Sequence, residues 1–298
     1  MRVLFIVIAL ATVGSTASAQ TPPESLPPSP EAPAAQMQGQ DAGERRDAPD
    51  ASDQAFVAAE PDFTLIALPS TLRLPDGRWG FRVSHRFTRS LGEGSLADLA
   101  SDFFGFDSGS LVGLELRYGV RPGTQLVLLR TSDRTMQLMA QQSVVSAGTR
   151  AIGVDAIAAV QGLDNFSEDF TTTLGLLLSR RFGDRGAVYA EPLVVLNALP
   201  EADDSDATVM VGLGTRIRFG ASTYLVAEFT PRLSGPTPGD HHGSVAIEKR
   251  RGGHSFQINF SNSFATTLGQ IARGYGSTGS WHIGFNISRK FYRHMGSR

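Results

Sequence analysis

Cysteine is absent from the 298-residue sequence, and this excludes several kinds of chemistry at once. Without cysteine the chain has no disulfide, no thiolate metal ligand, no c-type haem attachment and no lipid-modified N-terminal cysteine. A cysteine nucleophile is excluded in the same way. Any site must therefore use carboxylates, amides, hydroxyls, imidazoles or guanidinium groups.

An excess of either charge is also missing, as are long apolar runs. Lys and Arg number 27 and Asp and Glu number 29, which gives a net charge of -2. A balanced charge lacks the basic surface that binds nucleic acid, so no nucleic-acid partner is expected. Apart from the N-terminus, no run approaches ~18 consecutive apolar residues, and no transmembrane helix is expected.

The first 19 residues are typical of a secretory signal peptide. Arg2 provides a positive start, residues 3–13 are apolar, and Ala17-Ser18-Ala19 is a small-residue cleavage site. The apolar run is too short to span a membrane as a helix. We expect cleavage before Gln20 and export from the cytoplasm.

Residues 20–61 have the composition of a disordered spacer. They are rich in Pro, Ala, Gln, Asp and Glu and show no apolar periodicity. Such a segment cannot bury enough apolar surface to offset the entropy of ordering it. We interpret it as a periplasmic linker, and the alternative is a tail that binds peptidoglycan or another periplasmic partner.

From residue 62 to residue 298 the pattern changes to alternating segments of about ten residues, the length of a transmembrane strand. Every second residue is apolar, as in "WHIGFNISRKF" at 281–291. Twelve strands are predicted, at residues 79–88, 111–120, 125–131, 136–145, 152–161, 171–181, 187–197, 207–218, 224–231, 244–250, 255–263 and 280–291.

The links between these strands alternate in length. After even-numbered strands they are short and contain glycine, as in "RPGT", "FGDRG" and "RRGGH"; after odd-numbered strands they are usually longer, with "SDRT" as an exception. An outer-membrane barrel has short periplasmic turns and longer outer loops, whereas a soluble β-sandwich does not require this alternation. The sequence favours an all-β, antiparallel, up-and-down transmembrane barrel with lipid around its apolar face.

Four stretches also carry a family resemblance: "FGFDSGS", "LELRYGV", "GGHSFQINFSNS" and "GFNISRKF". Over residues 63–291 the chain resembles an uncharacterised family of bacterial outer-membrane β-barrels, a domain of unknown function. The resemblance implies an outer-membrane barrel and brings no activity or site residues. The aromatic Phe291 is similar to the C-terminal signal read by the barrel-assembly machinery, although "YRHMGSR" follows it.

The phase of the strands assigns a set of polar side chains to the lumen. Charges of both signs are interspersed among them, so they could form an internal ion-pair network or an arginine-lined path for a small polar solute. The candidates are Arg82, Arg86, Glu115, Arg117, Asp155, Glu191, Arg216, Arg218, Glu228, Glu248, Asn286 and Lys290.

Catalysis and metal binding have weaker signals. Ser84 and His85 are neighbours on a strand and point to opposite faces, so they cannot share a proton; His282 could meet a serine of an adjacent strand. The Asp240-His241-His242 triplet is interpreted as an exposed polar loop, because a closed metal site needs more ligands. We expect no cofactor, no metal and no enzyme activity.

The long link after the first strand contains "SLADLASDFFGF", whose spacing predicts a short helix capped by Ser95. This link could constrict the mouth or lie on the rim. The leading function is a small pore or solute channel of unknown specificity. The alternatives are a structural or partner-binding barrel without transport and, third, a hydrolase or acyltransferase for envelope lipid.

Overall fold

The computed structural model describes residues 59–107, 109–146, 152–199, 207–235, 239–274 and 279–291. The predicted signal peptide, all of the predicted spacer up to residue 58, and the tail after Phe291 lie outside these residues. No helix in the described part of the chain is long and apolar enough to span a membrane.

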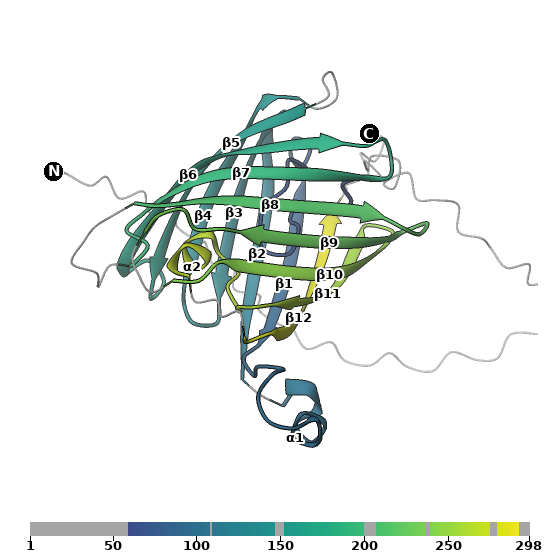
Figure 1. The fold of residues 1–298 in the computed structure, drawn as a ribbon. Coiled ribbons are helices and arrows are strands. Elements are labelled where there is room, and N and C mark those ends of the chain that lie inside the picture. Colours follow the sequence, from purple (N-terminus) through teal and green to yellow (C-terminus); the bar gives the residue numbers. More distant parts are fainter. Residues whose placement is uncertain are drawn as a thin grey trace, which may run out of the picture. The chain divides into compact units, whose positions relative to one another are not determined.

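Twelve antiparallel strands close into a single barrel, in which each strand pairs with its neighbours in sequence and β1 pairs with β12 (Figure 1). The predicted fold class is confirmed, and the predicted strand bounds fall within three residues of the observed ones. The strands are β1 Trp79–Phe87, β2 Ser110–Arg121, β3 Thr124–Thr131, β4 Met136–Val145, β5 Ile152–Leu163, β6 Glu168–Arg181, β7 Gly186–Leu196, β8 Thr208–Arg218, β9 Thr223–Thr230, β10 His242–Arg251, β11 His254–Ser261 and β12 His282–Phe291.

The two faces of each strand differ as the alternation predicts. In β12, Asn286 and Ser288 are buried inside the barrel, whereas Ile287 lies between them on the outer face and is 38% exposed. An outer face of Leu, Ile, Val and Phe is stable only against lipid, because water would leave this apolar surface hydrated. The barrel therefore presents a continuous apolar belt to the membrane.

The links after the even-numbered strands, all of them short, lie at one end of the barrel together with the start of β1 and the end of β12; at the other end the β3–β4 and β5–β6 links are also short and the remaining links are longer. Trp79 pairs with Phe291 at the end where β1 starts, and its ring centroid lies 4.3 Å from that of Tyr118, so aromatic side chains mark the interface there. Gly123 and Gly252 occupy the turns with φ values of 81° and 57°, which glycine adopts without strain. Because short turns face the periplasm, we take this end as periplasmic.

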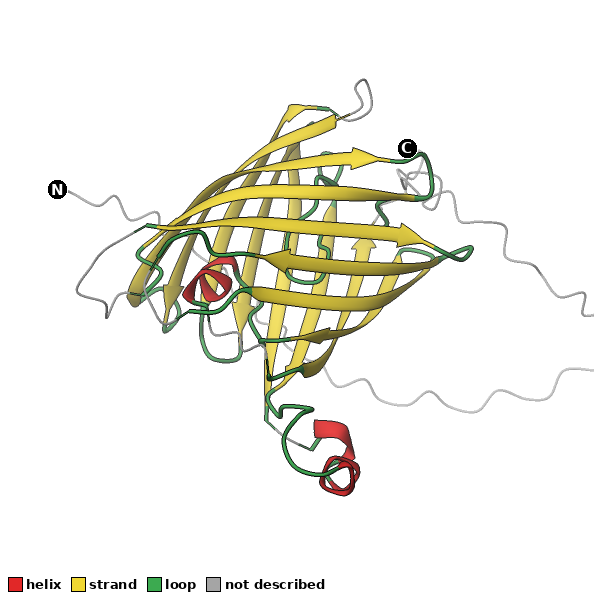
Figure 2. Ribbon diagram, in the orientation of Figure 1, coloured by secondary structure: helices red, strands yellow, loops and turns green. Residues whose placement is uncertain are grey.

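The helix predicted after the first strand is confirmed as α1 Leu96–Ser101, followed by the short helix η2 Phe103–Gly105. Ser95 caps α1, and its backbone N–H and hydroxyl both donate to Asp98, which keeps the pKa of that carboxyl below its usual value. The segment projects from the barrel rim (Figure 2) and Leu96 is 75% exposed. It lies outside the mouth, with Phe106 packed on Phe87 at a ring distance of 4.6 Å.

A second short helix, α2 Leu268–Arg273, was not predicted. It belongs to the link between β11 and β12, and all six of its residues are buried. Leu268 and Ile271 join the apolar cluster inside the barrel, so this link turns into the outer mouth (Figure 1).

The segment before β1 is the second unpredicted feature. Residues 59–71 are all buried, and they run within the ring of strands (Figure 1). Leu65 N–H donates to Leu68 O and Ser70 N–H donates to Phe63 O, each at 2.8 Å, which folds the segment back on itself. We call residues 59–74 the lumenal hairpin. The chain enters the hairpin and leaves it at the periplasmic end.

Candidate functional site in the barrel lumen

The twelve predicted lumen residues differ in burial and in whether they contact the lumenal hairpin. Eleven are buried in the interior of the barrel, and Arg218 is half-buried, with its guanidinium donating to the carbonyls of Gly220 and Ala221 in the β8–β9 turn. Eight of the eleven contact the lumenal hairpin: Arg82, Arg86, Arg117, Asp155, Arg216, Glu228, Asn286 and Lys290. Passage of a solute along these residues stays a prediction.

The turn of the hairpin is bound by one carboxylate. Glu228, on β9, accepts hydrogen bonds from the backbone N–H groups of Ile66 at 2.5 Å, Ala67 at 3.0 Å and Leu68 at 2.9 Å. Three successive N–H groups pointing at one anion form a concave donor site of the kind that favours carboxylates. Because the acceptor is charged, each bond is worth about 1.5–3 kcal/mol before coupling among them is considered.

The opposite side of the same turn is bound by donors. The carbonyl oxygen of Ile66 accepts from Arg86 at 3.3 Å and Asn286 at 3.1 Å, and from the guanidinium of Arg82. Arg86 also donates to the side-chain oxygen of Asn286 at 2.8 Å, so the donors position one another. The wall thus contacts the main chain of the turn from both sides with complementary charge.

The first limb of the hairpin rests on Arg216 of β8. Its guanidinium donates to the carbonyls of Asp62 at 3.2 Å and Thr64 at 2.7 Å, and pairs with Glu248 at 3.0 Å. Gln257 of β11 donates to Leu65 O at 2.8 Å. Glu248 thus acts on the hairpin indirectly, because it neutralises the charge of Arg216, which contacts the hairpin.

Ion pairs and hydrogen bonds secure the hairpin at the periplasmic end. Glu60 is fully buried, forms an ion pair with Arg181 at 2.6 Å, and accepts a hydrogen bond from the hydroxyl of Tyr189 at 3.1 Å. Lys290 donates to the carbonyl of Pro61. Residues 59–61 were assigned to the predicted spacer; in the structure they lie inside the barrel.

The returning limb contacts the opposite wall. The hydroxyls of Thr71 and Ser179 are 2.6 Å apart, and Arg73 forms an ion pair with Asp155. On the first limb, close to the turn, Arg117 donates to the Thr64 hydroxyl at 2.7 Å and pairs with Glu115 at 2.5 Å. The hairpin is thus bonded to strands all around the barrel rather than to one side of it.

Apolar packing adds to these polar contacts. Leu65 and Leu68 are no more than 1% exposed and belong to the interior cluster with strand residues. Two glycines of β8 make room for them: a Cβ at Gly214 would lie 2.3 Å from Leu65 Cδ1, and one at Gly212 would lie 2.9 Å from Leu68 Cδ1. These two glycines therefore leave space in the wall for the leucine side chains of the hairpin.

The hairpin and the link between β11 and β12 line a common small void inside the barrel. A void of about 10 Å³ lies among Thr64, Ala67, Leu268 and the facing strands, which is about the volume open to a single water molecule. The hairpin fills the lumen from the periplasmic end and α2 fills it from the outer end. Both elements thus occupy the interior of the barrel.

Residues 62–291 match the model of a family described as a membrane bound beta barrel domain (DUF5777). The chain belongs to this family. The match covers the lumenal hairpin from Asp62 as well as all twelve strands, so both are parts of one family domain. The expected membership of an uncharacterised barrel family is confirmed, and the chain is a membrane-bound β-barrel. A search of curated proteins finds no match.

Solved structures similar to this β-barrel include two porins and one outer membrane protein, each matched over 72% of this chain. They are the NanC porin (8% identity, TM-score 0.49, 100% of that chain), the KdgM porin (9%, 0.45, 99%) and Omp33 of Acinetobacter baumannii (10%, 0.42, 99%). Likeness at this level says nothing about what this barrel binds or passes.

A serine and a histidine meet inside the barrel in a way that the sequence did not indicate. Ser263 Oγ lies 3.1 Å from His242 Nδ1, and His242 Nε2 lies 3.8 Å from Glu228. Nucleophilic catalysis needs such a pair and also access for the substrate. Both side chains are only 3% exposed, and Glu228 already accepts from the hairpin, so the pair is bonded as part of the interior. The absence of enzyme activity stays a prediction.

His242 also corrects the interpretation of residues 240–242 as an exposed loop. It begins β10 and faces the lumen, whereas Nδ1 of His241 accepts from the backbone of Arg232. Within the described residues no group of three or more acidic or histidine side chains could hold a metal ion. The strand was predicted to begin at residue 244. If its alternation is extended back by two residues, His242 falls on the strand.

The lumenal hairpin was not predicted from the sequence. Its signal was the apolar stretch "FTLIALP" at 63–69, which follows the spacer and precedes the first strand without pairing with a predicted neighbour. Glu191 is a further surprise: it is fully buried, and neither of its carboxyl oxygens bonds to a described residue. The strand phase placed it correctly, but the missing partner depends on three-dimensional packing.

Proposed function

We propose that this outer-membrane barrel is a channel for a small polar solute and that its resting state is closed by the lumenal hairpin. The observation that carries the proposal is the binding of the hairpin by the charged lumen residues. Glu228 accepts from its turn while Arg82 and Arg86 donate to it. These side chains would line a polar lumen if the hairpin moved away.

Displacement of the hairpin is compatible with the chain connections. Both limbs lead to the periplasmic end, so the hairpin can leave without threading a strand. Its contacts with the wall are hydrogen bonds, ion pairs and side-chain packing, none of which is covalent, since the chain has no cysteine. Withdrawal would expose arginines of β1, β2 and β8 to an incoming solute, which favours anionic or strongly polar cargo.

A second function is favoured by a separate observation. All six residues of α2 are buried, and Ile271 belongs to the same apolar cluster as Leu65. This second element would still narrow the outer end after the hairpin had left. The barrel would then be a closed structural or partner-binding unit that anchors the preceding segment to the membrane.

Single-channel recording in planar bilayers separates the two functions. The full chain is compared with a variant lacking residues 59–74, after both are shown to migrate as folded, heat-modifiable species. We expect the full chain to be mostly silent and the deletion to give stable, discrete conductance steps. A folded deletion variant that stays silent supports the closed barrel, and steady conductance of the intact chain contradicts closure by the hairpin.

A reversible lock tests movement of the hairpin without deleting it. The Thr71 and Ser179 hydroxyls are 2.6 Å apart, so Thr71→Cys with Ser179→Cys should form a disulfide between hairpin and wall. Oxidation should abolish any openings of the full chain, and reduction should restore them. Each single substitution is the control, because the native chain contributes no thiol. Openings that persist in the oxidised double variant would show that solute flow does not require this movement.

A further inference from the structure

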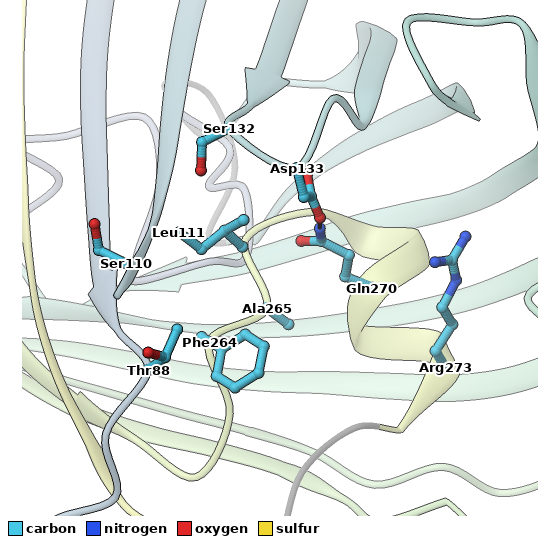
Figure 3. A pocket seen from close by; sticks show the side chains of 9 residues that line it. All are labelled: Thr88, Ser110, Leu111, Ser132, Asp133, Phe264, Ala265, Gln270 and Arg273. Atoms are coloured by element: carbon cyan, nitrogen blue, oxygen red, sulfur yellow. Dashed lines mark hydrogen bonds between the residues drawn. The ribbon is translucent and has the colours of Figure 1, made fainter. Parts of the chain in front are cut away.

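A cavity of about 390 Å³ lies at the outer mouth of the barrel, separate from the filled lumen. Its walls come from the ends of β1 and β2, the β3–β4 link, and α2 with the residues just before it (Figure 3). The volume is in the range of small-molecule sites, and such sites combine apolar walls with a few polar groups. The cavity is lined by apolar side chains together with a few polar ones.

The charged group that distinguishes the cavity is Arg273, the last residue of α2. Its side chain lines the cavity although only 9% of the residue is exposed. Its Nε donates to the carbonyl of Ala198 at 3.0 Å, but Nη2 has no hydrogen-bond partner, and within the described ranges no carboxylate pairs with it. A buried cation without a counterion costs several kcal/mol, so this group is suited to an anion that enters the cavity.

Among the described residues that line the cavity, the one carboxylate already has hydrogen-bond partners. Asp133 accepts from the backbone N–H of Thr135 at 3.1 Å and from the Gln270 amide at 3.1 Å, and it also bonds to the Thr131 hydroxyl. Figure 3 shows the Gln270 amide directed at Asp133, while Arg273 extends from the same helix one turn later. The negative and positive groups thus occupy different parts of the wall.

The remaining wall suits a compact apolar body. Leu111 and Ala265 are 8% and 6% exposed, and the ring of Phe264 borders them at the opening. Ser132 accepts from the backbone of Val112 at 3.0 Å and keeps its own proton for donation. An anion bound at Arg273 could therefore place apolar atoms on Leu111 and Phe264.

We propose that this outer-mouth cavity binds a small organic carboxylate, with the carboxylate at Arg273 and the apolar body against Leu111, Ala265 and Phe264. Guanidinium and carboxylate groups match in geometry and form strong charge-assisted hydrogen bonds. The site goes beyond the channel function and does not depend on it, because binding at the outer mouth requires neither an open lumen nor movement of the hairpin.

Titration calorimetry of the full chain in neutral detergent micelles tests the site, with benzoate as the probe. Benzoate should bind saturably, and the isosteric neutral benzamide should bind at least about tenfold more weakly, since it lacks the charge. Benzylammonium should not compete. Equal binding of benzoate and benzamide, or competition by benzylammonium, would overturn the proposal, because the cavity would then be selecting shape or cations.

Two substitutions assign the binding to Arg273. Arg273→Gln should weaken benzoate binding at least about tenfold, whereas Arg273→Lys keeps the charge and should retain part of it. Arg185→Gln is the matched control, because Arg185 is exposed in the tight β6–β7 turn at the other end of the barrel. Folding of each variant is checked by heat-modifiable migration. Unchanged affinity in folded Arg273→Gln, or an equal loss in Arg185→Gln, would refute the assignment.

Discussion

At the scale of single residues, the interior is organised by charges that bind main chain. Glu228 illustrates this, because its carboxylate accepts from three successive N–H groups of the hairpin turn and from the Ser244 hydroxyl at 3.1 Å. A carboxylate can accept at several positions, whereas an amide oxygen offers fewer and brings donors that would face the N–H groups. A glutamate at position 228 is thus better suited than a glutamine to bind the three N–H groups of the hairpin turn.

Glu228→Gln should therefore loosen the hairpin. A loss of about 2 kcal/mol corresponds to a roughly 30-fold higher population of the displaced state. The population is measured by the rate at which a water-soluble maleimide labels a thiol introduced by Ala67→Cys, a position 8% exposed in the closed state. Glu93→Gln, in the exposed outer loop, is the control. Equal labelling rates in the two variants would contradict the role of Glu228.

At the scale of elements, two helices of the same length have opposite environments. α1 and α2 each have six residues and each begins with a capping box, at Ser95 and Thr267. No residue of α1 is buried, whereas every residue of α2 is. The caps define where the helices start, but the packing of Leu268 and Ile271 against the strands decides that α2 lies inside the mouth.

The same substitution should therefore have different effects in the two helices. Leu268→Asp buries a carboxylate at a site 2% exposed and should destabilise the barrel by at least about 3 kcal/mol. Leu96→Asp, at a site 75% exposed, should change stability by less than about 0.5 kcal/mol. Urea titration of the heat-modifiable folded fraction measures both. Similar midpoints would show that α2 contributes little to the closed barrel.

At the scale of the whole molecule, both ends of the wall meet in one seam. β12 is the last strand and pairs with β1 along eight residues, from Trp79 with Phe291 to Arg86 with Gly284. Closure of the seam removes the exposed edges that a sheet would otherwise present. Phe291 ends β12 on the lipid face, where the Arg289 guanidinium lies 5.1 Å from its ring.

We expect Phe291→Ala to reduce the amount of assembled barrel in the membrane severalfold, if the assembly machinery reads this aromatic residue. Phe229→Ala is the matched control, because Phe229 also faces lipid and is 48% exposed, but lies within the wall in β9. Heat-modifiable protein in membrane fractions is the measurement. Equal yields from the two variants would remove Phe291 from a signalling role and leave it as one apolar contact among many.

Strand positions and facing were predictable because they depend on local periodicity. The alternation in β12 and the glycine turns follow from side-chain direction and turn chemistry, which act within a few residues. The same phase placed Glu228, Arg82 and Arg216 inside the barrel. Their partners were not predictable, since the hydrogen bonds of Glu228 to the hairpin join residues about 160 positions apart.

The sequence by itself determined a membrane-facing barrel of twelve strands, because each strand carries its own apolar and polar faces and each short turn after an even-numbered strand contains glycine. Only the tertiary structure decided what occupies the lumen. An apolar segment such as residues 63–68 can lie in several environments, and its place depends on whether a closed wall offers matching donors, acceptors and space. Gly214 provides that space for Leu65, and Glu228 provides the acceptor, once the twelve strands have closed around them.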